Sequence, residues 1–196
     1  MASEKNNVSP RDRITRTAFD LFYRQGYHAT GINQIIAESG VAKASFYDHF
    51  PSKEDLLMEY AREMAQREAD EMRRFAYSLP AGRERFFGVF KMLTPWFEQT
   101  GYRGCPFQNL MAESACELPA IKGIAALHRE NIRALARELF MAWTEENPEL
   151  ALRDIEDMAA TYVILVEGAI ATAVAYQANW PVEQAMTVLS RYLGET

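Results

Sequence analysis

Cysteine and histidine are scarce in this sequence, and their scarcity argues against several kinds of site. Two cysteines, Cys105 and Cys116, are too few for a disulfide framework and lack the C-x-x-C spacing of metal and redox motifs. One helix carrying both would hold their Cα atoms about 16 Å apart, beyond the reach of a disulfide. The three histidines, His28, His49 and His128, fall in separate predicted elements, so no Cys/His cluster is visible. We therefore predict no metal site and no cofactor.

The sequence also lacks an export signal and a convincing membrane segment. Residues 4–7 are polar, so no charged and apolar leader follows Met1. The one long apolar run, residues 158–176, contains Glu167 and several alanine, threonine and glycine residues. We interpret this run as a buried helix, and we expect a cytoplasmic protein with no membrane partner.

Strand patterns are missing as well, because no segment alternates β-branched and polar residues, while glycine and proline recur at helix-like intervals. We predict an all-α protein, with a three-helix DNA-binding domain over residues 1–52 and a helical bundle over residues 53–196. The net charge of −6 comes from residues 56–196, because residues 1–55 carry 7 basic and 7 acidic side chains. Charge thus permits nucleic-acid binding without demonstrating it. The predicted helices span about 10–25, 30–39, 42–50, 53–77, 83–99, 106–116, 119–146, 152–179 and 181–193.

Capping residues mark the ends of several of these helices. Ser9 precedes the first helix, and Ser52 opens a capping box at the fourth. Thr30 is predicted to cap the second helix, which Gly40 ends with a turn. Pro95 is expected to kink or shorten the fifth predicted helix.

The second and third predicted helices, joined by a glycine turn, have the arrangement of a helix-turn-helix. A recognition helix needs small or polar residues at its exposed N-terminal end, because it must enter a DNA major groove about 12 Å wide. Lys43, Ala44 and Ser45 meet that requirement.

Apolar and amphipathic side chains complete this motif. Phe46 and Phe50 are expected to anchor the recognition helix against the core. Tyr47 and His49 carry hydrogen-bonding groups suited to phosphates at the edge of the groove. Lys53, together with the first amides of the next helix, is predicted to bind a further phosphate. The alternative to DNA contact is that Lys43 and Lys53 are ordinary surface residues. In the same way, Ser9, Thr30 and Ser52 would be helix caps and nothing more.

Taken together, these residues resemble the TetR (tetracycline-repressor-like) family. The resemblance covers about residues 11–57 and rests on Thr30, Ile35, Gly40, Val41, Lys43, Tyr47, His49, Phe50, Ser52, Lys53 and Glu54. It implies a homodimeric repressor that binds operator double-stranded DNA and releases it when a small-molecule effector enters the C-terminal domain. It also implies DNA contacts from Thr30, Lys43, Ala44, Ser45, Tyr47, His49 and Lys53.

Three positions depart from the family's usual pattern. Ala42 replaces the hydroxyl residue that often starts the recognition helix, so its cap is weaker. Ile36 stands where a small alanine is common. Asp48 places an acid on the recognition helix, where it repels phosphates unless it accepts from a cytosine amine or a neighbouring arginine.

The C-terminal part is rich in aromatic residues, most of which we interpret as core. Helical bundles bind ligands in apolar pockets that contain a few polar groups, although periodicity does not say which helix faces meet a cavity. The predicted ligand-binding residues are Trp96, Phe107, Met111, His128, Tyr162 and Val166, with Glu113 or Glu167 as a polar contact.

Cys105 and His128 each allow two interpretations. Cys105 follows Gly104 at the start of a predicted helix, where free amides stabilise a thiolate, so it is a candidate thiol sensor switched by oxidation or alkylation. It is otherwise a small buried residue, which we favour. His128 lies on an apolar helix face, either as a satisfied core histidine or as a pocket group.

Small residues on the predicted helix of residues 152–179 suggest a close helix contact. Together with the last predicted helix, this fits a two-fold four-helix interface between two copies of the chain. The predicted interface residues are Gly168, Ala171, Ala175, Met186 and Leu189. A two-fold dimer would also place two recognition helices about 34–36 Å apart, as successive major grooves require.

Two other classes of function remain open. An enzyme needs a nucleophile–base pair, a phosphate-binding loop or a metal cluster, and none is visible in the sequence. A helix-turn-helix protein that now binds another protein is supported only by Asp48 and by the neutral N-terminal domain. For the repressor, we expect the helix that starts at Lys53 to act as a lever, which means that it transmits effector binding in the C-terminal part to the DNA-binding domain.

Overall fold

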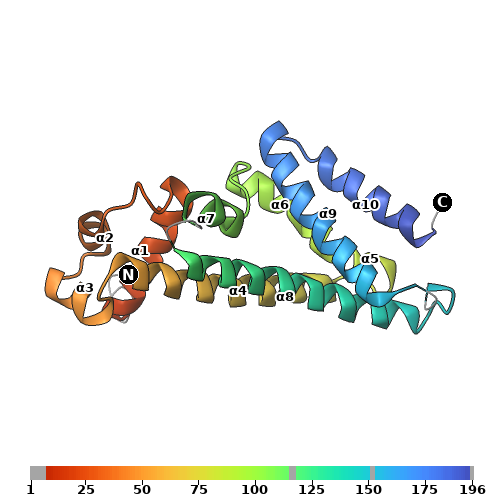
Figure 1. Ribbon diagram of the computed structural model, residues 1–196, viewed down its shortest axis with the longest axis horizontal. Coiled ribbons are helices and arrows are strands. Elements are labelled where there is room, and N and C mark those ends of the chain that lie inside the picture. The colour runs from red at the N-terminus through yellow and green to blue at the C-terminus, as the bar shows by residue number, and fades with distance from the viewer. Residues whose placement is uncertain (1–7, 115–117, 151–152, 195–196) are drawn as a thin grey trace, which may run out of the picture. The chain divides into compact units, whose positions relative to one another are not determined.

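The computed structural model describes residues 8–114, 118–150 and 153–194, and over these residues every regular element is an α-helix, as predicted (Figure 1). The helices are α1 (Pro10–Gln25), α2 (Ile32–Ser39), α3 (Lys43–His49), α4 (Lys53–Ser78), α5 (Arg83–Phe86), α6 (Gly88–Thr100), α7 (Pro106–Ser114), α8 (Pro119–Thr144), α9 (Ile155–Tyr176) and α10 (Trp180–Leu193). Cys116 and Leu152, where two predicted helix ends fall, lie outside the described residues.

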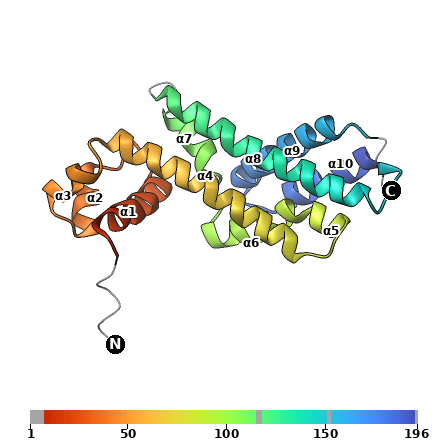
Figure 2. The same ribbon diagram turned by 90° about the horizontal axis from the view of Figure 1, so that it is seen from below.

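The described residues form two compact units. The first extends to Met64 and also contains Pro106–Ala125, and the second contains Ala65–Cys105 and the residues from Ala126 onward. The first unit therefore holds α1–α3, the first part of α4, α7 and the start of α8, and the last two lie far along the chain (Figure 2). The boundary predicted after residue 52 followed the motif alone, whereas the compact unit is larger.

Capping in the first unit follows the predictions at two helices and departs from them at a third. Ser9 Oγ accepts the N–H of Asp12 at 3.1 Å, and Ser52 Oγ accepts the N–H of Asp55 at 3.0 Å. The predicted Thr30 cap is wrong, because α2 begins at Ile32 and no side chain caps it. The hydroxyl of Thr30 instead donates to the carbonyl of Gly26 at 2.7 Å.

The turn between α2 and α3 is built around Gly40. Its φ of 65° lies in the left-handed region that glycine adopts without strain. The guanidinium of Arg13 donates to the Gly40 carbonyl at 3.3 Å. As predicted, Ala42 provides no side-chain hydrogen bond at the start of α3. The turn is therefore fixed mainly by backbone conformation and by the apolar residues on either side.

In the second unit, the helix break expected at Pro95 occurs earlier. Pro95 lies inside α6, and the break falls at Phe87, between α5 and α6. Gly88 explains part of this geometry, because a Cβ atom there would lie 2.7 Å from the Cα atom of Ala76 in α4. Only glycine permits this close approach of the two helices.

Aromatic rings form the core of the second unit. Phe86 contacts Phe140, Trp143 and Tyr162, with ring centroids 5.6, 5.2 and 5.2 Å away. The hydroxyl of Tyr162 donates to the Phe86 carbonyl at 2.9 Å, which satisfies it inside the core.

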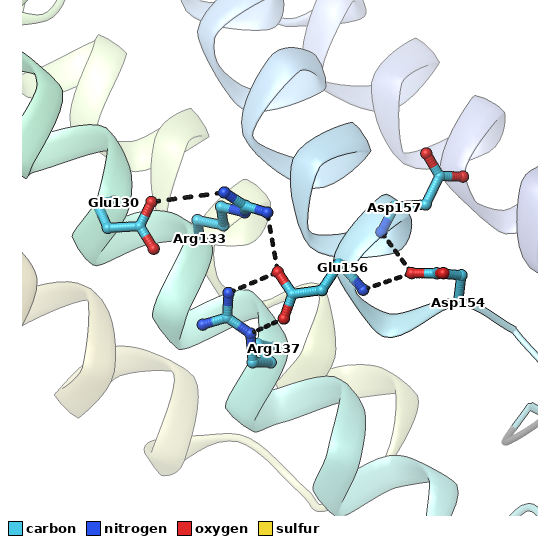
Figure 3. Close-up of polar contacts among 6 residues, drawn as sticks. All are labelled: Glu130, Arg133, Arg137, Asp154, Glu156 and Asp157. Carbon is cyan, nitrogen blue, oxygen red and sulfur yellow. Dashed lines mark hydrogen bonds and ion pairs between the residues drawn. The ribbon is translucent and has the colours of Figure 1, made fainter.

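Salt bridges connect the first turn of α9 to α8. Figure 3 shows the carboxylate of Glu156 between Arg133 and Arg137, at 2.8 Å from Arg133 Nη2 and 2.6 Å from Arg137 Nε. Asp154 caps α9 by accepting the N–H groups of Glu156 and Asp157, each at 2.9 Å. The arginines lower the pKa of Glu156, which keeps this connection ionised at neutral pH.

Among the described residues, α9 is the one helix long and apolar enough to cross a membrane by length and composition. It packs beside α10 (Figure 1), and 39% of its most apolar window is buried within the structure. Its apolar composition is therefore partly explained by packing inside the second unit, as the sequence predicted.

Candidate functional site

Five of the predicted DNA-contacting residues lie together on α3, where we call them the reading face: Lys43, Ala44, Ser45, Tyr47 and His49. All of them are exposed except Ser45, which is half-buried. Tyr47 keeps 43% of its surface accessible although it is a large aromatic residue. Asp48 is also exposed. A short helix thus presents a polar surface with one accessible ring.

Apolar residues on the opposite side of α3 hold the reading face outward. Phe46 is 0% exposed and Phe50 is 3% exposed, and their ring centroids are 6.3 Å apart. Ile14 of α1 and Ile35 of α2 are also 0% exposed and belong to the same core. Burying one such side chain stabilises a fold by about 1.5–3 kcal/mol, which is enough to fix the orientation of a helix this short.

Thr30 and Lys53 are the two predicted DNA contacts that the structure places elsewhere. Thr30 is 0% exposed, so its side chain is inaccessible. Lys53 Nζ donates to the carbonyls of Tyr27 and Thr30, each at 2.9 Å, and lies 4.1 Å from the centre of the Tyr27 ring. Desolvation lowers the pKa of Lys53. Lys53 therefore holds the loop between α1 and α2, and its contact with a phosphate stays a prediction.

A helix from the C-terminal half of the sequence holds the same loop. Glu113 of α7 accepts the backbone N–H of Tyr27 at 2.8 Å, and the Glu113 carbonyl lies 3.0 Å from Nε2 of His28. A Cβ atom at Gly26 would lie 2.6 Å from the Glu113 carboxylate, and φ is +90° there. Glu113 was one of two alternative polar contacts for a ligand, and in this structure its carboxylate binds the loop. Only the three-dimensional contact reveals this role.

A small cleft lies beside this contact, within the first unit. Its lining residues are Phe22, Tyr23, Tyr60, Pro106, Asn109, Leu110 and Glu113. None of the six residues predicted to bind a ligand lines it.

The six predicted ligand-binding residues are divided between the two units. Phe107 and Met111 belong to the first unit, and the other four belong to the second. Tyr162 and Val166 are buried, and the Tyr162 hydroxyl is bonded within the aromatic core. Trp96 is half-buried. A pocket formed by all six remains a prediction.

His128 instead belongs to a polar group of side chains inside the second unit, which we call the Cys105 cluster. Its members are Glu68, Cys105, His128, Arg129 and Glu167. Cys105 Sγ lies 4.0 Å from His128 Nε2, and His128 Nδ1 lies 3.5 Å from Glu68 Oε2. Arg129 Nη2 lies 2.6 Å from Glu167 Oε2. The sequence showed no such cluster because its members come from α4, α8, α9 and the residue before α7.

Burial shifts the protonation of two members of the Cys105 cluster. Desolvation, helped by the charge of Arg129, lowers the pKa of His128 to about 4. Desolvation, helped by Glu71, raises the pKa of Glu68 to about 8. At neutral pH the imidazole is therefore uncharged and most Glu68 side chains are protonated. His128 is 3% exposed, so it lies in the core, and its role as a pocket group stays a prediction.

Cys105 is 3% exposed, which agrees with the interpretation of a small buried residue. Its reactivity as a thiol sensor stays a prediction. Cys116 lies outside the described residues.

Two protein-family models match this chain. Residues 14–60 match "Bacterial regulatory proteins, tetR family", and residues 82–189 match "Tetracyclin repressor-like, C-terminal domain". The first match contains the reading face, and the second contains the Cys105 cluster except Glu68.

Individual relatives agree with these matches. The HTH-type transcriptional regulator YxaF of Bacillus subtilis is 33% identical over 142 residues, which cover 68% of this chain and 65% of that protein. LmrA, an HTH-type transcriptional regulator of the same organism, is 51% identical over 57 residues, or 29% of this chain and 30% of LmrA. Each of these two is thus matched over less than two thirds of its own length. The crystal structure of a TetR-family transcriptional regulator from Streptomyces coelicolor superposes with a TM-score of 0.79 at 25% identity, covering 94% of this chain and 88% of that one.

The position of Lys53 generates a stability prediction. Lys53→Ala removes the ammonium donor from two backbone carbonyls, and we expect it to lower the free energy of unfolding by about 1–3 kcal/mol. Lys43→Ala on the reading face is the matched control, with an expected change within about 0.5 kcal/mol. Urea unfolding followed by circular dichroism at fixed protein concentration measures both. Equal stability of Lys53→Ala and wild type would contradict the structural role of Lys53.

Proposed function

Because this chain belongs to the TetR family of bacterial regulatory proteins, we propose that it is a homodimeric repressor that leaves its operator when a small molecule binds its C-terminal domain. The family membership makes the chain a helix-turn-helix transcriptional regulator and not an enzyme. Repression, the effector and the dimer are the proposed steps.

The observation that supports DNA binding most directly is the reading face of α3. Lys43 and Ala44 are exposed at the N-terminal end of the helix, where a recognition helix meets base edges. Tyr47 and His49 are exposed further along and suit phosphates at the edge of the groove. The buried Phe46 prevents the helix from turning this face inward.

An apolar face of α9 supports a dimer. Gly168, Ala171 and Ala175 are all exposed in the single chain, and Ile164, one turn before Gly168, is 71% exposed. These four residues follow the spacing of one helix face. Such a stripe of small and apolar residues suits the close packing of a second copy.

The contribution of α10 differs from the prediction. Leu189 is 0% exposed and belongs to the core of its own chain, so its assignment to the interface is wrong. Met186 is half-buried, and Val188 is 40% exposed. Val188 therefore joins the proposed interface in place of Leu189. The sequence did not distinguish these two neighbours because both are apolar residues on the same short helix.

Two routes could carry the effector signal to the reading face. The first is the lever helix α4, which begins at Lys53 and continues without a break to Ser78. The second is α7, whose Glu113 binds the loop that precedes α2. An effector acts through either route only to the extent that it binds one arrangement more tightly than the other.

Operator binding is tested by fluorescence anisotropy with DNA that flanks the protein's own gene, across a salt series. Tyr47→Ala is expected to weaken binding by about 1.5–3 kcal/mol, because it removes a hydrogen bond to a charged phosphate. Lys43→Ala is expected to reduce the slope of log affinity against log salt by about 1, because one cation no longer displaces counterions. Lys122→Ala, an exposed lysine of α8, is the control and should bind like wild type.

A steep salt dependence would dismiss the alternative that the helix-turn-helix has become a protein-binding module. Absence of binding at low salt, with the fold intact by circular dichroism, would favour that alternative.

The dimer is tested by light scattering coupled to size-exclusion chromatography. Ile164→Glu places a charge on the proposed interface, where it has no partner, and should convert the dimer to a monomer at the same protein concentration. Leu127→Glu alters another exposed apolar residue, 52% accessible on α8, and should leave the dimer intact. If Ile164→Glu stays dimeric, the interface lies elsewhere.

A further inference from the structure

We propose that Cys105, His128 and Glu167 form a binding site for one divalent transition-metal ion of the zinc type. This inference goes beyond the proposed function and does not depend on it. The site lies wholly within the second unit, and its three residues come from different parts of the sequence.

The geometry of the donor atoms supports the site. The thiol sulfur, an imidazole nitrogen and a carboxylate oxygen of these residues all lie within 4.8 Å of one another. Zinc bond lengths of about 2.0–2.3 Å in a tetrahedron place donor atoms roughly 3.3–3.6 Å apart. The observed Sγ to Nε2 distance of 4.0 Å therefore requires only small side-chain rotations. Three protein ligands leave the fourth position of the metal to water or another ligand.

Glu68 lies beside the ring nitrogen of His128 that would not bind the metal, where a side chain can orient the imidazole. A metal-bound histidine normally donates the N–H of its other ring nitrogen to a carboxylate or carbonyl. Here Nε2 of His128 faces Cys105, while Nδ1 lies 3.5 Å from Glu68 Oε2. In its ionised form, which a nearby dication would favour, Glu68 accepts the Nδ1–H of His128 and so selects the form of the imidazole whose Nε2 lone pair points toward Cys105. Glu68 is thus a positioning residue.

The charges around the site are compatible with a cation despite the presence of Arg129. Arg129 Nη2 lies 2.6 Å from Glu167 Oε2, and a carboxylate can bind an arginine and a metal through its two oxygens. Binding of the metal releases the thiol proton of Cys105. With Glu68 protonated, the thiolate and the Glu167 carboxylate leave one net positive charge on the group formed with Arg129 and a dication, and loss of the Glu68 proton on metal binding would balance it.

The ligand types select the metal. Thiolate and imidazole favour zinc and similar ions, whereas magnesium and calcium prefer sites made entirely of oxygen. We therefore expect Zn²⁺ and Co²⁺ to bind, and Mg²⁺ not to compete.

Because Cys105 directly precedes α7, metal binding at this site would affect that helix. Glu113 of α7 holds the loop before α2. A metal bound to Cys105 would restrict the start of that helix. If the proposed DNA binding is correct, Zn²⁺ should change operator affinity, which is a separate readout from metal binding itself.

The test is Co²⁺ titration of the full-length, reduced and metal-stripped protein, followed by absorption spectroscopy. We expect one ion per chain, a thiolate-to-cobalt charge-transfer band, and loss of the spectrum when Zn²⁺ is added. Cys105→Ser should abolish the charge-transfer band, and Cys116→Ser is the matched control that should retain it. Glu68→Gln should weaken binding by about 10–100-fold while keeping the band, as expected for a residue that orients a ligand.

Two further variants separate metal binding from folding. His128→Gln and Glu167→Gln should each weaken binding at least tenfold with an unchanged circular dichroism spectrum, whereas Glu130→Gln, an exposed acid of α8, should not. A folded wild-type protein that shows no thiolate band, or a band lost only in Cys116→Ser, would overturn the site. Reaction of Cys105 with electrophiles in a protein that binds no Co²⁺ would assign the cluster to a thiol sensor instead.

Discussion

The position of the reading face in the first unit depends on the contacts that fix the loop between α1 and α2. Glu113 of α7 accepts the N–H of Tyr27 at 2.8 Å, and Lys53 of α4 donates to the carbonyls of Tyr27 and Thr30. A partly buried hydrogen bond to a charged group contributes about 1.5–3 kcal/mol, so the two contacts are strong relative to the marginal stability of a small unit. The loop leads directly into α2, and α2 supports α3. The position of the reading face therefore depends on α4 and α7, the two helices that hold the loop.

A few residues join this loop contact to the second unit. The helix that binds the loop begins immediately after Cys105, and Cys105 belongs to a buried polar cluster of the second unit. Metal binding or thiol modification at Cys105 would therefore act next to the start of the nine-residue helix that carries Glu113. The helix α4 offers a second path, because it begins at Lys53 and continues into the second unit. Both helices contact the same loop through side chains, Glu113 of α7 and Lys53 of α4.

The sequence predicted those features that depend on local rules. The Ser9 and Ser52 caps, the glycine turn at Gly40 and the buried Phe46 were all predicted, since each follows from neighbouring residues. What the sequence did not show are partners that are distant along the chain. The contact of Lys53 with the loop between α1 and α2 was not predicted, and Leu189 was assigned to the interface although its own chain buries it. The Cys105 cluster was missed for the same reason, because spacing along the chain says nothing about which helices pack together.

Amide hydrogen exchange of Tyr27, compared between wild type and Glu113→Gln, tests most directly whether α7 fixes the loop on which the reading face depends. A neutral amide oxygen is a weaker acceptor than a carboxylate, so exchange at Tyr27 should become faster in Glu113→Gln and operator affinity should change with it. Glu98→Gln, an exposed acid of α6, is the control and should exchange like wild type. Unchanged exchange at Tyr27 and unchanged DNA binding in Glu113→Gln would contradict a coupling role for α7, and would leave α4 as the proposed route for an effector signal.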